Sequence, residues 1–308
     1  MLTLLCSGQG TQHAGMFRLT GDAQGAEPIF AAASALLGAD PRDWVRTATP
    51  EALRRNRLAQ ILCVTQALAA QRLIQAARPD LVLVVGYSVG QVAAWGIAGM
   101  LAEAPLLALA ARRAELMDLA GGEHDGLVSV RGLPRDRVEA LARQKDVEIA
   151  IVNPGGAFIL GGRAESVAAF REAALEAGAQ RSTVLAVSVA SHTSRLAAAV
   201  PALREAILAA NPSSPRPGVT LLDGLAGETL FTTARAIDAL SRQIAEPVRW
   251  AACLDAAIER GASAFLELGP GRALADMANA AYPDIPARGI EDFSSAAGLL
   301  DWLGRFAA

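Results

Sequence analysis

Runs of aliphatic residues alternate with segments of helical periodicity along most of the 308-residue chain. Residues 2–6 and 80–85 are short aliphatic runs, whereas residues 58–75, 91–100 and 104–119 carry apolar positions at helical spacing. A continuous aliphatic run of this length is typical of a strand that is buried on both faces, as in a parallel sheet. The alternation therefore predicts an α/β fold in which crossover helices cover a parallel sheet.

The order of elements changes after the glycine-rich stretch 121–126. From there the pattern predicts the order βαββαβ of a ferredoxin-like split, with strands at 126–131, 147–152, 157–161 and 181–188 and helices at 134–143 and 164–177. We therefore predict an α/β-hydrolase-like parallel-sheet domain built from residues 1–122 and 189–308, with a ferredoxin-like subdomain inserted at 123–188. The second part of the large domain is expected to contain strands at 219–222 and 263–268 and helices at 193–210, 233–244 and 248–260.

Composition excludes several classes of protein. The formal net charge is −3 and basic residues form no block, so the chain lacks the electrostatic footprint of a nucleic-acid-binding protein. Cys6, Cys63 and Cys253 are far apart and have no metal-ligand spacing, which predicts buried thiols in a reducing compartment and no bound metal. The first residues have no basic region of a signal peptide, and we expect a cytoplasmic protein.

Residues 81–101 contain no charged side chain and are long enough to span a bilayer. Four glycines interrupt this segment, its first half is rich in β-branched residues, and its second half has a helical pattern. A strand, a tight turn and a buried helix explain these features better than a membrane span. No membrane partner is expected.

The turn in this segment reads Gly86-Tyr87-Ser88-Val89-Gly90, a GxSxG motif between a predicted strand and a predicted helix. Glycines suit a turn too tight for side chains, which would hold Ser88 in a strained conformation at the carboxyl end of the sheet. Free N–H groups at the start of the following helix would stabilise a developing oxyanion there. We predict that Ser88 is a nucleophile; a purely structural turn is the alternative.

A serine nucleophile needs a general base, and the chain has three histidines. His13 follows the GQG loop, and His124 lies in the polar stretch at the predicted domain boundary. His192 follows the apolar run LAVSVAS, so we expect it at a strand end and favour it as the base. No histidine follows His192 and no HGGG segment precedes Ser88, which makes an ordinary α/β-hydrolase esterase a poor fit.

Several motifs together resemble one family. They are GQGTQ at 8–12, GYSVGQ at 86–91, Arg113, Ser-His at 191–192, QIAEPVRW at 243–250 and ELGPGR at 267–272. This combination resembles the malonyl-CoA:acyl carrier protein transacylases over essentially the whole chain. The resemblance implies that Ser88 carries the malonyl group as an ester and that His192 acts first as base and then as acid. It also implies an oxyanion hole formed by the backbone N–H groups of Gln9 and Val89.

The same resemblance implies that Arg113 binds the free carboxylate of malonate. Arginine suits this role because it pairs carboxylates bidentately and keeps its charge; the alternative for Arg113 is a solvated residue near a helix end. Gln243 would help to fix the imidazole in place of an acid, and Asn153 would support the site. No cofactor is expected to be bound: malonyl-CoA is the expected substrate, and the thiol of a carrier protein's prosthetic arm is the expected acceptor.

The chain departs from the family motif GHSxGE by having Tyr87 and Gln91, and Cys6-Ser7 replaces the usual Phe-Pro before GQG. Tyr87 and the following AAWG at 93–96 resemble the epsilon subunit of malonate decarboxylase, so we expect the carrier subunit of that complex, with its phosphoribosyl-dephospho-CoA type of arm, as acceptor. The alternative is a transacylase of fatty-acid synthesis with a phosphopantetheine carrier. A serine hydrolase and a catalytically inactive carrier-binding module are more distant alternatives.

Overall fold

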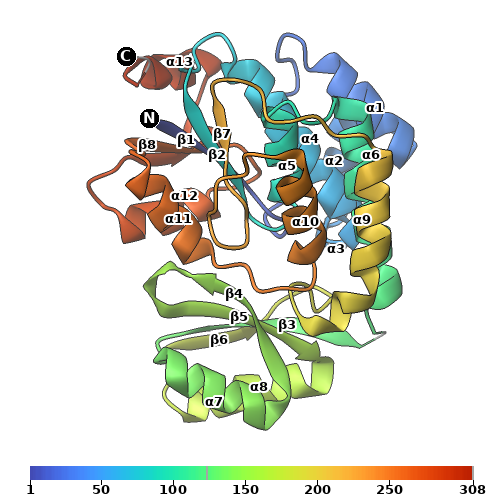
Figure 1. Ribbon diagram of the computed structural model, residues 1–308, viewed down its shortest axis with the longest axis vertical. Coiled ribbons are helices and arrows are strands. Elements are labelled where there is room, and N and C mark those ends of the chain that lie inside the picture. Colours follow the sequence, from blue (N-terminus) through green and yellow to red (C-terminus); the bar gives the residue numbers. More distant parts are fainter. Residues whose placement is uncertain (123, 307–308) are drawn as a thin grey trace.

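The computed structural model describes residues 1–122 and 124–306. Its larger sheet has five parallel strands in the order β7-β2-β1-β8-β9 (Figure 1). The strands are β1 (Leu2–Cys6), β2 (Val82–Gly86), β7 (Val219–Leu221), β8 (Ala264–Glu267) and β9 (Ala287–Gly289). The predicted parallel α/β sheet is confirmed.

Successive residues of the central strands enter two different apolar layers. Leu4 of β1 and Val84 of β2 pack with helices α4 (Asn56–Ile74), α5 (Gly90–Ile97) and α6 (Glu103–Ala120). Leu5 and Val85 face the other layer, which includes α11 (Trp250–Glu259) and α12 (Ala273–Ala281). Because both faces of the strands are covered, the aliphatic runs in the sequence are continuous rather than alternating.

The remaining helices of the large domain complete these layers. They are α1 (Glu27–Leu37), α2 (Pro41–Thr47), α3 (Pro50–Leu53), α9 (Val200–Ala209), α10 (Thr233–Gln243) and α13 (Ala296–Gly304). In the part of the chain that is described, no helix is both long enough and apolar enough to cross a membrane. The uncharged segment 81–101 instead contains β2, the Ser88 turn and α5.

A second, antiparallel sheet forms the lower lobe in Figure 1. Its strands β3 (Asp125–Arg131), β4 (Val147–Asn153), β5 (Ala157–Arg163) and β6 (Arg181–Val184) have the order β4-β5-β3-β6, which is the ferredoxin-like order. Helices α7 (Arg135–Lys145) and α8 (Ala164–Glu176) cover the face of this sheet that points away from the large domain. The predicted limits of the inserted subdomain, between residues 122 and 123 and between residues 188 and 189, stay a proposal. Residue 123 lies outside the described residues.

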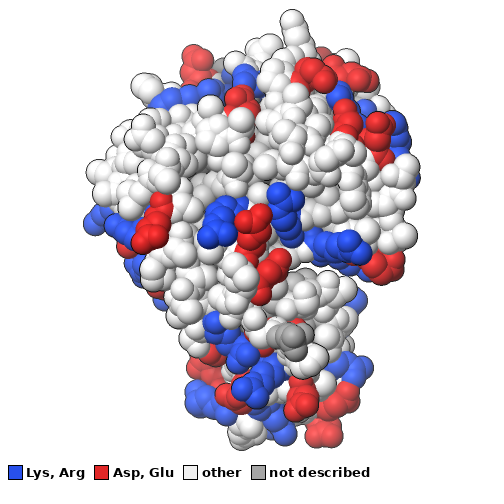
Figure 2. All heavy atoms as spheres, turned by 90° about the vertical axis from the view of Figure 1, so that its right-hand side faces the viewer, with Lys and Arg blue, Asp and Glu red and all other residues white. Residues whose placement is uncertain are grey.

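Main-chain hydrogen bonds join the small sheet to the segment of the large domain between α10 and α11. Val152 N donates to Val248 O at 2.8 Å, and Val248 N donates to Ala150 O at 2.9 Å. Ile151 of β4 lies in the same apolar cluster as Trp250 of α11. The side of the molecule in Figure 2 shows acidic and basic side chains intermixed over the lower lobe, without a broad surface of one sign.

Three predicted elements differ from the structure. Strand β6 ends at Val184; Leu185 N still donates to Leu127 O of β3 at 2.8 Å, residues 186–188 leave the sheet, and Leu185 and Val187 line a cavity. The segment predicted as one helix at 193–210 is a 3-10 helix η2 (Ser194–Ala199) followed by α9, in which Pro201 occupies the first turn, where a missing N–H costs nothing. Helix α11 starts at Trp250, because Val248 is used to pair with β4.

Candidate active site

The turn around Ser88 is closed by two glycines. A Cβ atom on Gly86 would lie 2.1 Å from the main-chain carbon of Gly90, and one on Gly90 would lie 2.0 Å from the carbonyl oxygen of Cys6. Ser88 itself has a φ of 55°, in the left-handed region that non-glycine residues rarely occupy. The turn between β2 and α5 is therefore a strained elbow that presents the serine hydroxyl at the carboxyl end of the sheet.

The serine hydroxyl and the imidazole of His192 are within hydrogen-bond distance. His192 Nε2 lies 2.8 Å from Ser88 Oγ, and His192 Nδ1 lies 2.6 Å from the main-chain carbonyl oxygen of Gln243. Because a carbonyl only accepts, Nδ1 carries the proton and Nε2 is free to accept the hydroxyl hydrogen. A main-chain carbonyl thus occupies the place that a carboxylate has in a Ser-His-Asp triad.

Burial keeps this histidine neutral. His192 is 1% exposed, and its burial, together with the positive charge of Arg113, lowers its pKa to about 3. Its φ of 64° also places it in the left-handed region, so the surrounding contacts must hold its backbone in place. A neutral imidazole beside the hydroxyl is the protonation state that a general base requires.

Arg113 of α6 is buried beside the same hydroxyl. It is 1% exposed, its Nη1 donates to Oε1 of Gln60 at 2.7 Å, and its Nη2 lies 3.4 Å from Ser88 Oγ. Its Nε has no hydrogen-bond partner and no carboxylate pairs with it among the described residues. Burial lowers the pKa of Arg113 to about 9, which leaves the guanidinium charged at neutral pH.

Gln60 was not predicted from the sequence. It is fully buried in α4, and its carbonyl oxygen holds one side of the Arg113 guanidinium. The sequence signal that could have indicated Gln60 is a polar residue within the predicted apolar helix at 58–75. Because a glutamine is neutral, it orients the guanidinium without cancelling its charge, so the arginine remains able to bind an anion.

One cavity of about 70 Å³ is lined by Ser88, His192, Arg113 and Gln9. A second cavity of about 150 Å³ shares Gln9, Leu185 and Val187 with it and leads on to Arg54. Among the described residues, the main-chain N–H groups of Gln9 and Val89 make no hydrogen bond. Two unused donors therefore lie on segments that flank the hydroxyl.

Comparison with known proteins assigns this arrangement to a family. Residues 3–297 match the acyl transferase domain. The chain belongs to this family. It is 33% identical over 303 residues to the malonyl CoA-acyl carrier protein transacylase of Mycobacterium tuberculosis strain H37Rv, covering 94% of this chain and 96% of that relative. It is 28% identical over 305 residues to the Escherichia coli K12 protein of the same name, with 96% and 97% covered.

Solved structures agree with this assignment. The transacylase from Mycobacterium tuberculosis superposes with a TM-score of 0.86 at 31% identity and covers 99% of both chains. A transacylase from Burkholderia pseudomallei superposes with a TM-score of 0.90 at 27% identity, covering 97% of this chain and 99% of that one. A malonyl-transacylase solved in complex with a type II polyketide acyl carrier protein, PlMCAT with AntF, has a TM-score of 0.90 at 26% identity, with 97% and 99% covered. The chain is therefore an acyltransferase, similar in sequence and fold to malonyl CoA-acyl carrier protein transacylases.

The remaining candidate residues of this acyltransferase are Gln243, Asn153, His13 and His124, and they lie in different parts of the structure. Gln243 contacts His192 through its main chain, and its buried side-chain amide has no partner among the described residues. Asn153 ends β4 and is not one of the described residues that line the 70 Å³ cavity. His13 is exposed and lies 2.9 Å from Glu291, and His124 is exposed at the edge of the lower lobe.

Gln91, which departs from the family glutamate, fastens the elbow of this acyltransferase to the sheet. Its Oε1 accepts from Gly86 N at 2.9 Å, and its Nε2 donates to Leu222 O at 2.9 Å. An amide donates and accepts at the same time, which an ionised carboxylate cannot do. The residue that follows β7 is thereby tied to the end of β2.

Ser7, another departure from the family pattern, also has a structural partner in the acyltransferase. Its hydroxyl donates to Oε1 of buried Glu267 at 2.6 Å, which joins the carboxyl ends of β1 and β8. Burial raises the pKa of Glu267 to about 7, although this hydrogen bond and one from Ala275 N oppose the rise. Tyr87 packs edge-to-face on Trp250 with ring centroids 5.2 Å apart.

Proposed function

We propose that this acyltransferase moves a malonyl group from malonyl-CoA to the prosthetic-group thiol of an acyl carrier protein, through a malonyl ester on Ser88. The observation that carries the proposal is the guanidinium of Arg113, buried 3.4 Å from the nucleophile without a carboxylate partner among the described residues. A buried charge is costly until it is paired. A substrate whose acyl group ends in a carboxylate supplies that partner, whereas an acetyl group does not.

The first half-reaction begins with attack of Ser88 Oγ on the thioester carbonyl as His192 Nε2 takes the hydroxyl proton. The carbonyl oxygen becomes an oxyanion and accepts hydrogen bonds from the N–H groups of Gln9 and Val89. The tetrahedral intermediate collapses by breaking the carbon–sulfur bond. The leaving thiolate of CoA takes the proton back from His192, and the malonyl ester remains on Ser88.

The second half-reaction reverses these steps with a different thiol. His192 removes the proton of the carrier thiol, the sulfur attacks the ester carbonyl, and Ser88 leaves and regains a proton from His192. The main-chain carbonyl of Gln243 holds Nδ1 throughout, so that the ring keeps one tautomer in both directions. The charge balance of the site is unchanged at the end of the cycle.

The relatives favour the phosphopantetheine carriers of fatty-acid or polyketide synthesis as acceptors, since those reported above are transacylases of acyl carrier proteins. The carrier subunit of malonate decarboxylase is the second candidate, favoured by Tyr87 and by the AAWG at 93–96. Tyr87 lines the cavity and packs on Trp250, and Trp95 is fully buried in the core. Tyr87 therefore affects the interior of the site and Trp95 the packing of the core, rather than the surface that receives a carrier.

The test is intact-protein mass measured after brief mixing with malonyl-CoA, followed by addition of a carrier. The proposal expects a malonyl adduct on the wild type, none on Ser88→Ala, and discharge to the carrier faster than to water. Running both carrier types in parallel identifies the acceptor. Loss of the adduct at the same rate with and without either carrier would instead identify a hydrolase, and absence of any adduct would indicate an inactive binding module.

A further inference from the structure

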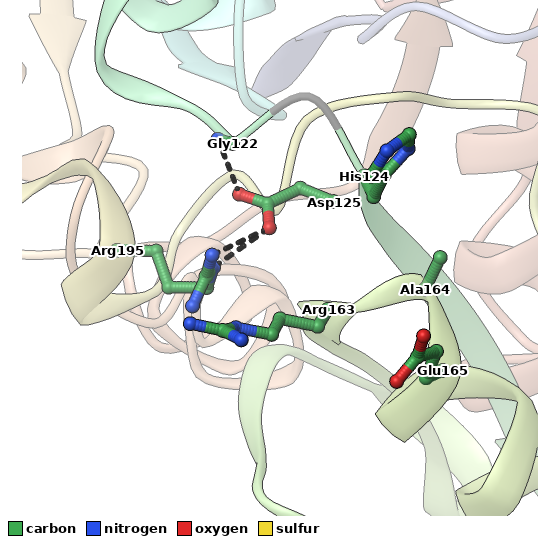
Figure 3. A pocket seen from close by; sticks show the side chains of 7 residues that line it. All are labelled: Gly122, His124, Asp125, Arg163, Ala164, Glu165 and Arg195. Carbon is green, nitrogen blue, oxygen red and sulfur yellow. Dashed lines mark hydrogen bonds and ion pairs between the residues drawn. The ribbon is translucent and has the colours of Figure 1, made fainter.

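The chain segment that follows His192 is held by the lower lobe. A cavity of about 550 Å³ lies where the two lobes meet, and Asp125, Arg163 and Arg195 line it (Figure 3). Oδ1 of Asp125 accepts from Nη2 of Arg195 at 2.7 Å and from its Nε at 2.9 Å, while Oδ2 accepts from Gly122 N at 3.0 Å. The side chain of Asp125 is 1% exposed, so this ion pair is shielded from water on the carboxylate side.

A second acidic residue of the lower lobe holds the neighbouring position. Glu148 of β4 accepts from the main-chain N of Ser194 at 2.8 Å through Oε2, and its Oε1 accepts from the hydroxyl of the same serine. Ser194 is the first residue of η2, where main-chain N–H groups have no partner within the helix. Asp125 and Glu148 thus bind consecutive residues, and both belong to strands of the small sheet.

These two contacts lie two and three residues after the general base. On its other side the base is held by the large domain, since His192 N donates to Ile244 O at 2.7 Å and Nδ1 contacts Gln243 O. The left-handed φ of 64° at His192 is a strained conformation that persists only when contacts on both sides impose it. The lower lobe supplies the contacts on the carboxyl-terminal side.

We propose that Asp125 and Glu148 are positioning residues for acyl transfer, which hold the main chain after His192 so that Nε2 stays within 2.8 Å of Ser88 Oγ. Neither side chain lines the cavity that contains Ser88, and both act through Arg195 and Ser194. The small sheet is then part of the catalytic apparatus as well as a wall of the substrate cavity. The proposal rests on the proposed transfer through Ser88.

Asp125→Asn and Glu148→Gln keep the shape of each side chain and remove its charge. We expect each to lower the rate constant of Ser88 acylation about ten- to a hundredfold, because small displacements of a catalytic group have effects of this size. KM for malonyl-CoA is expected to change less than twofold. Ser194→Ala, which removes one hydrogen bond from Glu148, should have a smaller effect in the same direction.

The rate is measured per active site, with the amplitude of the CoA-release burst counting the folded, competent molecules. A merely structural role would lower this amplitude and leave the rate constant unchanged. Glu165→Gln is the matched control: it removes a carboxylate from the same cavity, but one that makes no hydrogen bond to residues 192–195, and wild-type rates are expected.

If Asp125→Asn does not fold, the exposed Glu148 and Ser194 variants decide the question. Acylation rate constants within twofold of wild type in the folded variants would overturn the positioning role. Failure of the proposed function is distinguishable, because in that case the wild type forms no malonyl adduct at all.

Discussion

At the scale of single residues, we propose that Arg113 selects the acyl groups that the site accepts. Its guanidinium is fixed by neutral Gln60 and has no carboxylate partner among the described residues, so a bound substrate carboxylate would complete its pairing. A hydrogen bond to a charged group is typically worth about 1.5–3 kcal/mol when the environment is dry. Selection of malonyl over acetyl groups is therefore expected to depend on this one side chain.

Arg113→Ala should lower kcat/KM for malonyl-CoA roughly hundredfold, while transfer from acetyl-CoA stays the same or increases. The reason is that the malonyl carboxylate would be buried without a partner. The measurement is the kcat/KM ratio for the two thioesters. Arg112→Ala, at an exposed neighbouring position, is the control and should retain wild-type selectivity. Unchanged selectivity in Arg113→Ala would refute the assignment.

The pH dependence follows from His192. Its folded-state pKa of about 3 lies below the value of about 6.5 expected for an unfolded chain, so the base stays neutral well below pH 6. We expect kcat/KM to show no acid limb near pH 6.5. The unfolded state binds this proton first, so the contribution of His192 to stability should fall as pH falls from about 6.5 toward 3, whereas the raised pKa of Glu267 acts in the opposite direction between about 4.5 and 7. A pH–rate profile together with unfolding at several pH values checks both statements, and an acid limb near 6.5 would contradict the first.

At the scale of elements, the elbow depends on how closely three segments approach. The end of β1, the end of β2 and the start of α5 meet at Gly90, where a Cβ atom would lie 2.0 Å from the carbonyl oxygen of Cys6. Gln91 then ties the elbow to the residue after β7. The geometry of Ser88 is thus a property of the packed sheet and helix, and not of the turn sequence alone.

Gly90→Ala is expected to destabilise the fold by about 1–3 kcal/mol or more, because backbone atoms of β1 would have to move. Gly298→Ala is the matched control in α13, where the nearest atom to a new Cβ is Ser295 Oγ at 3.5 Å. That change should stabilise the protein by about 0.5–1 kcal/mol, since alanine is the better helix former. Urea unfolding measures both, and equal midpoints for the two variants would show that the elbow tolerates a side chain.

At the scale of the whole molecule, the two sheets are coupled through a shared core. Leu127 and Ile151 of the small sheet cluster with Trp250 and Leu254 of the large domain, and β4 forms main-chain hydrogen bonds with Val248. The positioning contacts of Asp125 and Glu148 cross the same boundary. The lower lobe is therefore expected to unfold together with the large domain.

This expectation can be measured because all four tryptophans, at positions 44, 95, 250 and 302, lie outside the small sheet. Tryptophan fluorescence and hydrogen exchange of peptides from residues 126–163 should give the same urea midpoint. Ile151→Ala should lower both midpoints together, at a cost of about 2–5 kcal/mol. Two separated transitions would show that the lobes fold independently.

The sequence alone determined the α/β class, the βαββαβ order of the lower lobe and the position of the elbow. These features depend on local patterns. Aliphatic runs indicate strands that are buried on both faces, helical periodicity indicates the helices that pack on them, and the glycines beside Ser88 indicate the tight turn. Residue motifs also indicated the family, which the comparisons confirm. The branch within the family was not determined, because Tyr87 and the AAWG favour the decarboxylase carrier whereas the relatives reported above are transacylases of acyl carrier proteins.

Only the tertiary structure decided which groups meet. His192 and Ser88 are 104 positions apart, and the carbonyl that holds the imidazole belongs to a third segment. Sequence patterns could not show that the chain leaves the sheet after Leu185 beside the cavity, that Gln60 orients Arg113, or that Asp125 and Glu148 contact the chain after His192. Such contacts depend on the packing of distant segments, and hydrophobic periodicity records which face of an element is buried, but not its partner.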